Sequence, residues 1–270
     1  MDTILKSFKT VLVPVDFSVN TEVAIAKTLA LVERDTATIH LLHVLKPSPF
    51  YAGKAVYRER KRKLEEWRRS IEECAGLTVR CELLQGHSVQ RSIRKSAESL
   101  RPDAIVIGQT AMHTGLSFAR TMMPMALAQA TGIPVLTVKP GALHNKTRTV
   151  VVPVTDAFPE SKLQALEVLC RHGRPNIHLI TLVNGKNGPS DFSAAALVHM
   201  FQWLKMRLHC PVEYAVVRGR NKAKAFLQYA EKINADVLLV HPEKETWIGW
   251  WNRHTSDVLP VGSKVQVLAV

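Results

Sequence analysis

The stretch Phe8–Ser18, FKTVLVPVDFS, decides the fold, because a continuous apolar run leads directly into polar residues and the whole pattern recurs. The second copy is Thr147–Asp156, TRTVVVPVTD, with its Val-Pro-Val core 139 positions later. Asp103–Gly108, DAIVIG, returns as Asp236–His241, DVLLVH, 133 positions later. Landmarks that recur in the same order at nearly constant spacing indicate two copies of one unit, each long enough to form its own core.

The repeat predicts two domains, which we place at residues 1–141 and 146–270. Between them Lys139–Asn145, KPGALHN, interrupts the periodic chain with Pro-Gly and Asn, which is typical of a short linker. Each repeat alternates short β-branched apolar runs with amphipathic stretches, the pattern of βαβ units around a parallel sheet. The predicted fold class is therefore α/β, with two tandem Rossmann-like domains whose five parallel strands are flanked by helices.

Strands are expected at 10–15, 38–44, 78–84, 104–107 and 135–138 in the first repeat, and at 149–154, 177–182, 212–217, 237–240 and 265–269 in the second. Helices are expected at 19–33, 57–74, 90–100, 118–130, 159–171, 192–208, 222–233 and 255–259. In such sheets ligands bind outside the carboxyl ends of the strands, where the strand order reverses. A functional site is therefore expected in the loops that follow the strands.

Composition narrows the class of protein. Hydrophobic residues make up 46% and charged residues 22%, as in ordinary globular domains, and no apolar run approaches the roughly 20 residues that span a bilayer. The N-terminal MDTILKSFKT lacks an apolar signal core, so a cytoplasmic location is expected. Neither a CxxC pair nor a disulfide-like spacing is present, which favours buried or inert thiols for the four cysteines, Cys74, Cys81, Cys170 and Cys210.

The chain is basic, with 36 Lys plus Arg against 23 Asp plus Glu and a net charge of +13. Basic residues gather in the helix expected at 57–74, whose apolar stripe comprises Tyr57, Leu64, Trp67, Ile71 and Cys74. The basic face is either a solvated surface or a surface for phosphates or lipid headgroups. No nucleic-acid-binding motif accompanies it, so no specific nucleic-acid partner is expected.

Four short segments in fixed order resemble the universal stress protein family. They are Leu12–Ser18 (LVPVDFS), Leu41–Val44 (LLHV), Asp103–Gly108 (DAIVIG) and Ile133–Pro140 (IPVLTVKP). The resemblance covers each repeat almost end to end. It implies adenine nucleotide alpha hydrolase-like domains of strand order 3-2-1-4-5, stress-linked expression and, in one branch of the family, bound ATP.

The resemblance implies a nucleotide site whose adenosine side is kept and whose phosphate-binding motif is largely lost. ATP-binding members have Gly-x2-Gly-x9-Gly-Ser/Thr after the fourth strand, and here Gly108 fits the first glycine. Ala111, Thr121 and Met122 occupy the other three positions. A Cβ crowds a cradle where backbone must approach phosphate closely, and methionine offers no hydroxyl donor. The phosphate side is therefore expected to be impaired. Its remaining contacts are Gly108, Gln109 and Thr110.

The adenosine side matches the family better. The resemblance assigns Val13, Pro14 and the backbone at Val44 to the adenine pocket, and Asp16 to the adenosine contact. The same aspartate, or Ser18, is also well placed to cap the helix that follows. Both interpretations stay open.

Two further features flank this mouth of the sheet. Gly86 is expected to need a positive φ in the turn after the third strand. His43, His87 and His113 lie near the same mouth, but their spacing is not a zinc signature, so no metal is expected.

The second repeat departs further from the family pattern. Thr155 stands in place of Asp16, and the segment 241–244, HPEK, replaces the glycine loop. A tryptophan-rich segment follows, with Trp247, Trp250 and Trp251. These side chains either plug the vacant cleft or form a surface for an apolar ligand, a protein partner or a membrane interface.

The sequence contains no catalytic constellation, because it lacks a nucleophile elbow, a Walker loop, an HExxH motif and a pair of carboxylates placed for acid–base work. The expected function is a non-enzymatic tandem stress protein that binds a small molecule or a protein partner. Two alternatives stay open: weak ATP binding or slow ATPase activity by the first domain, and binding of an apolar, lipid-like anion with peripheral membrane contact. The resemblance also implies an internal pseudo-dimer through fifth strands at 133–139 and 264–269, and leaves a further homodimer open.

Overall fold

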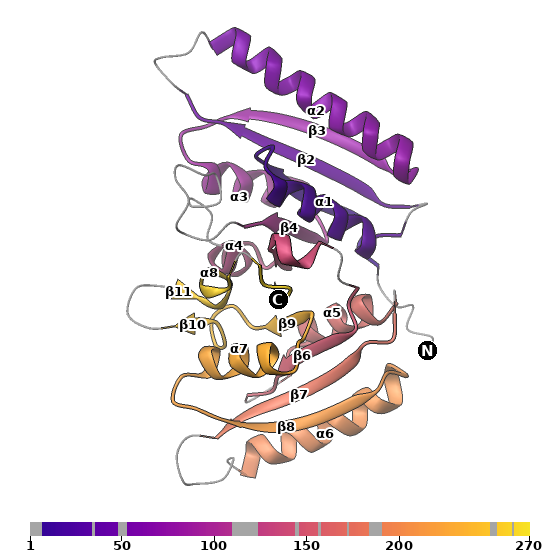
Figure 1. Cartoon of the computed structure of the whole chain (residues 1–270), viewed down its shortest axis with the longest axis vertical. Helices are drawn as coiled ribbons and strands as arrows, with labels where there is room; N and C mark the ends of the chain where they lie inside the picture. Colours follow the sequence, from indigo (N-terminus) through magenta and orange to yellow (C-terminus); the bar gives the residue numbers. More distant parts are fainter. Residues whose placement is uncertain are drawn as a thin grey trace. The chain divides into compact units, whose positions relative to one another are not determined.

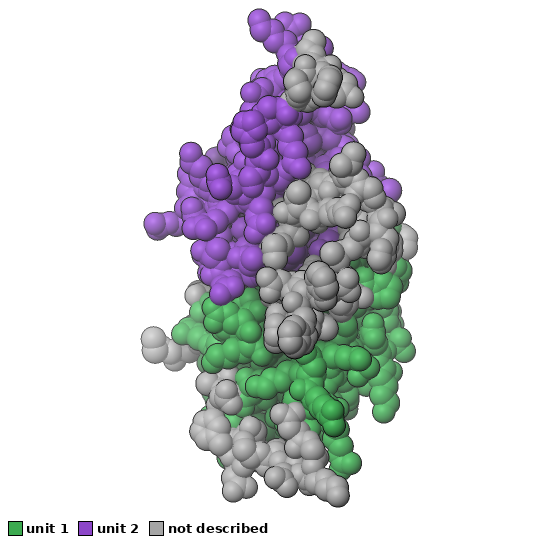
Figure 2. Space-filling view, turned by 90° about the vertical axis from the view of Figure 1, so that its left-hand side faces the viewer, with its two compact units in different colours: residues 1–6, 139–270 green, residues 7–138 purple. Residues whose placement is uncertain are grey.

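The structure is a computed structural model of the whole chain. It describes residues 7–33, 36–47, 53–109, 124–143, 146–155, 158–171, 173–183, 191–248, 253–260 and 262–270. The chain divides into two compact units, one of residues 7–138 and one that contains the chain from residue 139 onward (Figure 2). Each unit is an α/β domain built on parallel strands (Figure 1). The fold class expected from the sequence is confirmed.

The strand order is the same in both domains. The first domain contains β1 (Thr10–Val15), β2 (Thr38–Leu45), β3 (Thr78–Gln85), β4 (Ala104–Gly108) and β5 (Val135–Val138), in the order β3-β2-β1-β4-β5. The second contains β6 (Thr149–Pro153), β7 (Asn176–Val183), β8 (Val212–Arg218), β9 (Val237–Val240) and β12 (Gln266–Ala269), in the order β8-β7-β6-β9-β12. Each domain therefore has the expected order 3-2-1-4-5, which reverses between its first and fourth strands and leaves room for a ligand there.

Helices connect the strands. The first domain has α1 (Val19–Leu31), α2 (Gly53–Ala75), α3 (Val89–Leu100) and α4 (Pro124–Thr131). The second has η2 (Pro140–Ala142), α5 (Glu160–Arg171), α6 (Asp191–Arg207), α7 (Lys222–Lys232) and α8 (Thr255–Val258), with a small antiparallel pair formed by β10 (Trp247–Ile248) and β11 (Arg253–His254). In the first domain α1 packs on β1 and β4, whereas α2 packs on β2 and β3. The two helices thus cover different strands, which leaves a groove between them.

The same device anchors the first strand of each domain. One carboxylate oxygen of Asp103 accepts hydrogen bonds from the backbone N–H groups of Lys9 and Thr10, both at 2.8 Å. Asp236 does the same for Arg148 and Thr149, at 2.8 and 3.0 Å. Each aspartate therefore satisfies backbone donors at the start of a central strand, which explains why both repeats begin their fourth-strand motif with Asp.

Most predicted elements differ from the observed ones by one or two residues, but α2 begins four residues earlier than expected. The part of the expected helix 118–130 before residue 124 lies outside the described residues. One prediction about α2 is wrong: Cys74 is exposed. The helix buries Leu64 and Ile71, whereas Cys74 belongs to its last turn, which contributes no buried residue.

The basic helix α2 carries its own counterions. Arg62 pairs with Glu66, Lys63 lies 3.1 Å from Glu59, and Arg68 lies 2.7 Å from Glu65 and 2.6 Å from Glu72. All these pairs are spaced three or four residues apart on an exposed helical face, where such pairs stabilise by a few tenths of a kcal/mol, about 0.3–0.5 each. This pairing favours the solvated-surface interpretation of the face.

Candidate functional site

The carboxyl ends of β1 and β2 bring together the side chains assigned to the adenosine side. Val13 and Pro14 are buried within β1, where they lie opposite Leu41 and Leu42 of β2. Val44 is buried near the end of β2. Asp16 follows β1 directly and is half-buried. These four residues therefore lie on neighbouring strands at one mouth of the first domain, and their role in ligand binding stays a prediction.

Asp16 organises the start of α1. Its Oδ1 accepts hydrogen bonds from the Ser18 backbone N–H at 3.0 Å, the Ser18 hydroxyl at 2.5 Å and the Thr21 hydroxyl at 2.7 Å. Ser18 is the N-cap residue of α1, and its side chain makes no capping hydrogen bond. The carboxylate thus accepts hydrogen bonds from the start of α1, although Asp16 lies two residues before the N-cap. The helix dipole also favours a negative charge at this end of the helix.

An aromatic and cationic cluster covers the same mouth. Phe17 has a left-handed backbone conformation (φ 61), which costs a bulky residue energy and is found mostly where the surroundings hold it. Its ring lies 4.8 Å from the His43 ring, 5.4 Å from the Trp67 ring and 5.4 Å from the Arg60 guanidinium. We call these four residues the Phe17 cluster. The cluster joins the end of β1 to β2 and α2.

His43 is held in one orientation within the cluster. Its Nδ1 donates a hydrogen bond to the Val15 carbonyl oxygen at 2.7 Å. Burial lowers the pKa of His43 below 6.5, and the nearby Arg60 adds to this effect, whereas the hydrogen bond to Val15 and the charge of Asp16 oppose it. The imidazole is therefore kept neutral at neutral pH and acts as a packed, hydrogen-bonded ring.

Two polar atoms beside this mouth are buried without a hydrogen-bond partner among the described residues. They are the side-chain oxygen Oδ1 of Asn20, at the start of α1, and Nε of Arg60, in α2. A buried polar atom left unpaired costs about 1–3 kcal/mol, so such atoms commonly mark a place where a water molecule or ligand binds. The first domain therefore has unmet hydrogen-bonding capacity at its strand ends.

Gly108 ends β4 against the backbone of α1. A Cβ atom at this position would lie 2.0 Å from the Asn20 carbonyl oxygen, so only glycine lets the helix start pass so close to the strand. Gln109 is buried, and its N–H donates to the Val138 carbonyl oxygen at 2.9 Å. Thr110, the third residue expected to contact phosphate, lies outside the described residues, as do Ala111, Thr121 and Met122.

Gly86 plays a different part from the one expected. The prediction of a positive φ is wrong, because the described glycines with positive φ are Gly76 and Gly132. A Cβ on Gly86 would instead lie 2.5 Å from the Ser92 hydroxyl in α3. The glycine is explained by this close approach of the third strand's loop to the following helix.

In the second domain a buried ion pair occupies the corresponding place. Lys162, in the first turn of α5, donates to the Pro153 carbonyl oxygen at 2.7 Å, where β6 ends. Its Nζ also lies 2.8 and 2.6 Å from the two carboxylate oxygens of Glu245. Glu245 in turn accepts from the His241 backbone N–H at 2.8 Å and the Thr155 hydroxyl at 3.4 Å. The pair therefore joins the carboxyl ends of β6 and β9.

The pair is sealed from solvent. The side chains of Lys162 and Glu245 are 1% and 2% exposed. Burial lowers the pKa of Lys162, and the opposing charge and hydrogen bonds of Glu245 limit that effect. A buried pair with its remaining hydrogen bonds satisfied keeps both charges in place. The strand ends of the second domain are thus filled by the protein's own charged groups.

The tryptophan-rich segment is described only at its edges. Trp247 belongs to β10 and lies opposite His254 of β11. Trp250 and Trp251 lie outside the described residues. In the parts of the chain that the structure describes, His, Cys, Asp and Glu side chains form no group of three that could hold a metal ion. No helix in those same parts is long and apolar enough to cross a bilayer.

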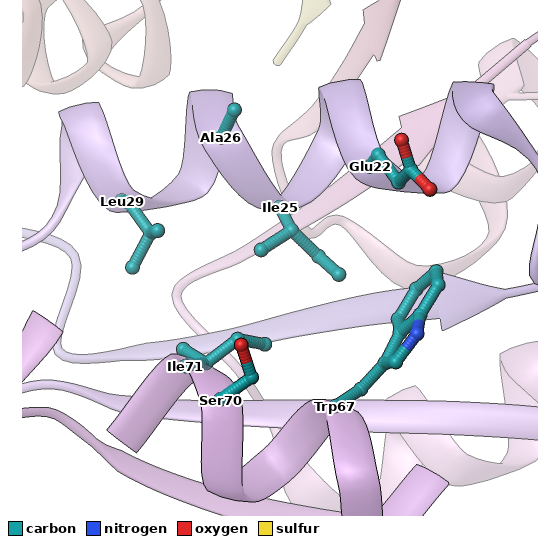
Figure 3. Close-up of a pocket in the computed structure, with 7 residues that line it drawn as sticks. All are labelled: Glu22, Ile25, Ala26, Leu29, Trp67, Ser70 and Ile71. Carbon is teal, nitrogen blue, oxygen red and sulfur yellow. The ribbon is translucent and has the colours of Figure 1, made fainter. Parts of the chain in front are cut away.

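The groove between α1 and α2 is an apolar pocket of about 260 Å³ (Figure 3). Trp67 points from α2 toward Glu22 and Ile25 of α1 in this view. The full lining comprises Glu22, Ile25, Ala26, Leu29, Trp67, Ser70 and Ile71. Its one charged lining residue is acidic, so the groove suits an anionic ligand poorly.

Sequence reasoning missed Lys162, Glu245 and Arg60. A signal for the first existed, because Lys162 lies on the same helical stripe as the buried Ala165, Leu166 and Leu169, and a lysine among apolar core positions needs a buried partner. Glu245 gave no comparable signal, since it lies in an irregular segment 83 residues further along the chain.

Comparison with known proteins relates this chain to one protein family. The model of the universal stress protein family matches residues 7–139. A crystal structure of a universal stress protein from Archaeoglobus fulgidus covers 96% of this chain and 97% of its own, with a TM-score of 0.71 at 18% identity. A functionally unknown protein from Pseudomonas aeruginosa PAO1 covers 97% of this chain and 92% of its own, with a TM-score of 0.56 at 14% identity. Comparison with curated proteins gives no match. The first domain, residues 7–139, therefore belongs to the universal stress protein family, and a second domain of the same strand order follows it.

Proposed function

We propose that this protein is a non-enzymatic stress-response module in which the first domain alone offers a ligand site at its strand ends. One contrast carries the proposal. In the second domain, Lys162 and Glu245 fill the strand ends and satisfy each other. In the first domain, Asn20 Oδ1 and Arg60 Nε are buried there without a hydrogen-bond partner in the described part of the chain. A ligand with both hydrogen-bond donors and acceptors would satisfy the first domain and has no place in the second.

Binding is favoured over catalysis by the way the polar groups at this mouth are used. Asp16 Oδ1 already accepts three hydrogen bonds from the first turn of α1. His43 Nδ1 is taken by the Val15 carbonyl oxygen. These hydrogen bonds give Asp16 a structural role at the start of α1 and fix the His43 ring within the Phe17 cluster, so both groups support a fixed binding surface.

A second, more specific candidate function is the binding of an adenine nucleotide such as ATP at this site. Arg60 provides a cation beside the strand ends, and a guanidinium pairs well with phosphate oxygens. Asp16, Val13 and Val44 match the residues that the family resemblance assigns to adenosine. The departures at Ala111, Thr121 and Met122 weaken the phosphate cradle, so binding should be weak and hydrolysis slow or absent.

The test is a calorimetric titration of the full chain with ATP, at nucleotide concentrations up to the millimolar range, beside a phosphate-release assay. The proposal predicts saturable binding that is weakened at least tenfold in Asp16→Ala and Arg60→Gln, and unchanged in Arg94→Gln, a control on the exposed face of α3. Phosphate release above that of a buffer blank would contradict the non-enzymatic role. Absence of binding would remove the nucleotide candidate and leave another small molecule or a protein partner.

An apolar, lipid-like anion is less well supported. Trp247, Trp250 and Trp251 remain a proposed surface for an apolar ligand, a partner or peripheral membrane contact, of which the structure describes Trp247 alone. The apolar groove that is described carries Glu22, which repels an anionic headgroup. Sedimentation with phosphatidylserine vesicles decides the matter. Salt-sensitive binding that is lost in the Trp250→Ala, Trp251→Ala double variant would revive this candidate.

Three further expectations also stay predictions: the domain limits 1–141 and 146–270, the internal pseudo-dimer and the cytoplasmic location. Native mass spectrometry reports the oligomeric state directly.

A further inference from the structure

Two cysteine thiols meet inside the second domain. Cys170 lies in the last turn of α5, and Cys210 lies between α6 and β8. Cys210 is near enough to Cys170 to raise the pKa of its thiol through a side-chain hydrogen bond and a coulombic interaction. Both are free thiols; Cys210 is buried, and Cys170 is partly exposed. The sequence gave no sign of this contact, because 40 positions separate the two residues and no CxxC spacing links them.

A second contact fixes the same two segments together. Three residues before Cys170, Glu167 accepts hydrogen bonds from Arg207, which lies three residues before Cys210. Both Nε and Nη2 of the arginine lie 2.9 Å from the same carboxylate oxygen. His209 then takes a left-handed conformation (φ 48), which redirects the chain where α6 ends. The ion pair thus ties together the two segments that carry the thiols, three residues before each of them.

We propose that Cys170 and Cys210 are an oxidation site that closes reversibly to a disulfide when a peroxide is present. The partly exposed Cys170 reacts first: its Sγ loses a proton, attacks one peroxide oxygen and breaks the O–O bond, giving a sulfenic acid and water or an alcohol. Cys210 Sγ then loses its proton and attacks Cys170 Sγ. The S–O bond breaks, water leaves, and the S–S bond forms. Two thiols are oxidised and one peroxide is reduced.

The surroundings set the rate and the lifetime of this bond. Burial raises the pKa of the Cys170 thiol, and the neighbouring Cys210 and Glu167 add to that effect. Since the thiolate is the attacking species, the first step is slow. A thiol of high pKa is also a poor leaving group in exchange, so the finished disulfide is reduced slowly. The site therefore responds to sustained exposure to oxidant and not to a brief pulse.

Closing the bond would lock the second domain. The disulfide would tie α5 to the entry of β8 and enclose α6 in a loop of about 40 residues. The chain-entropy model gives such a loop a stabilisation of several hundred-fold in the folding equilibrium constant, on the order of 10²–10³. Oxidation should therefore raise the unfolding midpoint of the second domain and leave that of the first domain unchanged.

The experiment treats the full chain with hydrogen peroxide for hours and maps its peptides without reduction. We expect one crosslinked peptide pair containing Cys170 and Cys210, a mass loss of two hydrogen atoms and restoration of both thiols by dithiothreitol. Cys170→Ser and Cys210→Ser should each abolish the crosslink. The Cys74→Ser, Cys81→Ser double variant serves as the matched control and should keep it.

Two results would overturn the proposal. One is sulfinic or sulfonic acid at Cys170 in the wild-type chain with no crosslinked peptide, because the second thiol would then be out of reach. The other is an equal rise of the unfolding midpoint in Cys210→Ser after oxidation, because stabilisation would then not depend on the bond. Mapping the wild-type chain keeps the test decisive even where a serine variant fails to fold.

Discussion

Removing one partner of the Lys162–Glu245 pair should be among the most damaging single changes in the second domain. In Glu245→Gln, Lys162 keeps the Pro153 carbonyl oxygen but loses its counterion at 2.6 Å. A buried charge without its partner costs about 3–5 kcal/mol. The lysine can escape by releasing its proton, which caps the cost near 4.6 kcal/mol at pH 7. We expect a loss of about 3–5 kcal/mol in the free energy of unfolding.

The complementary change, Lys162→Met, leaves Glu245 with the His241 N–H and the Thr155 hydroxyl as donors. A glutamate can escape by binding a proton, which costs about 3.7 kcal/mol for an ordinary carboxyl group at pH 7. The two variants therefore respond to pH in opposite directions. Glu245→Gln regains stability as the pH rises, because its folded state binds fewer protons than the unfolded chain. Lys162→Met regains stability as the pH falls.

Urea unfolding followed by tryptophan fluorescence measures the effect, because four of the five tryptophans lie after residue 139. The double variant removes both charges and should cost at least 2 kcal/mol less than the two single variants summed, the mark of a coupled pair. Arg94→Met breaks an exposed pair with Glu98 and should cost about 0.5 kcal/mol or less. Single-variant losses below about 1 kcal/mol, or additive losses in the double variant, would refute the buried pair.

Three further outcomes are expected. Gly108→Ala should destabilise the first domain by about 1–3 kcal/mol in urea titrations, whereas Gly86→Ala should cost less, because its new Cβ meets backbone atoms in the first case and a rotatable hydroxyl in the second. Burial lowers the pKa of His43 below 6.5, so the unfolded chain binds that proton more readily; stability should fall as the pH drops below 6.5, with a shallower fall in His43→Gln. Burial raises the pKa of Cys81 to about 11, so iodoacetamide should alkylate the exposed Cys74 first, as read by peptide mass spectrometry.

The strands were predictable because their signal is local. The runs VLVPV and AIVIG are apolar on both faces, short and rich in β-branched residues, which is typical of a strand covered on both sides of a parallel sheet. The observed β1 and β9 have the expected limits, and the repeat fixed the parallel domain architecture in both halves. Helix ends were less certain, because the last turns of a helix depend on what the helix packs against. Cys74, spaced like a core residue, is exposed for that reason.

The candidate site was predictable only in part. Asp16 and Gly108 stand out in the sequence, but the sequence does not reveal their structural roles. Asp16 accepts hydrogen bonds from the start of α1, and Gly108 allows β4 to approach the backbone of that helix. Arg60 reaches the site from α2, an element whose packing on β2 and β3 is a property of the whole domain. A side chain that arrives from a distant element leaves no pattern of spacing near the motif, so no periodicity could have placed it.

The sequence by itself determined that this protein is a repeated α/β domain, and it predicts a weakened phosphate cradle, because hydrophobic periodicity, strand motifs and missing glycines are all local features of short stretches. The tertiary structure alone decided which partners meet: Lys162 with Glu245 across 83 residues, and Cys170 with Cys210 across 40. These contacts depend on how the helices settle on the sheet. Burial then determines how these contacts behave. Inside a domain, a charge is costly unless it is paired, and a thiol with a raised pKa reacts slowly.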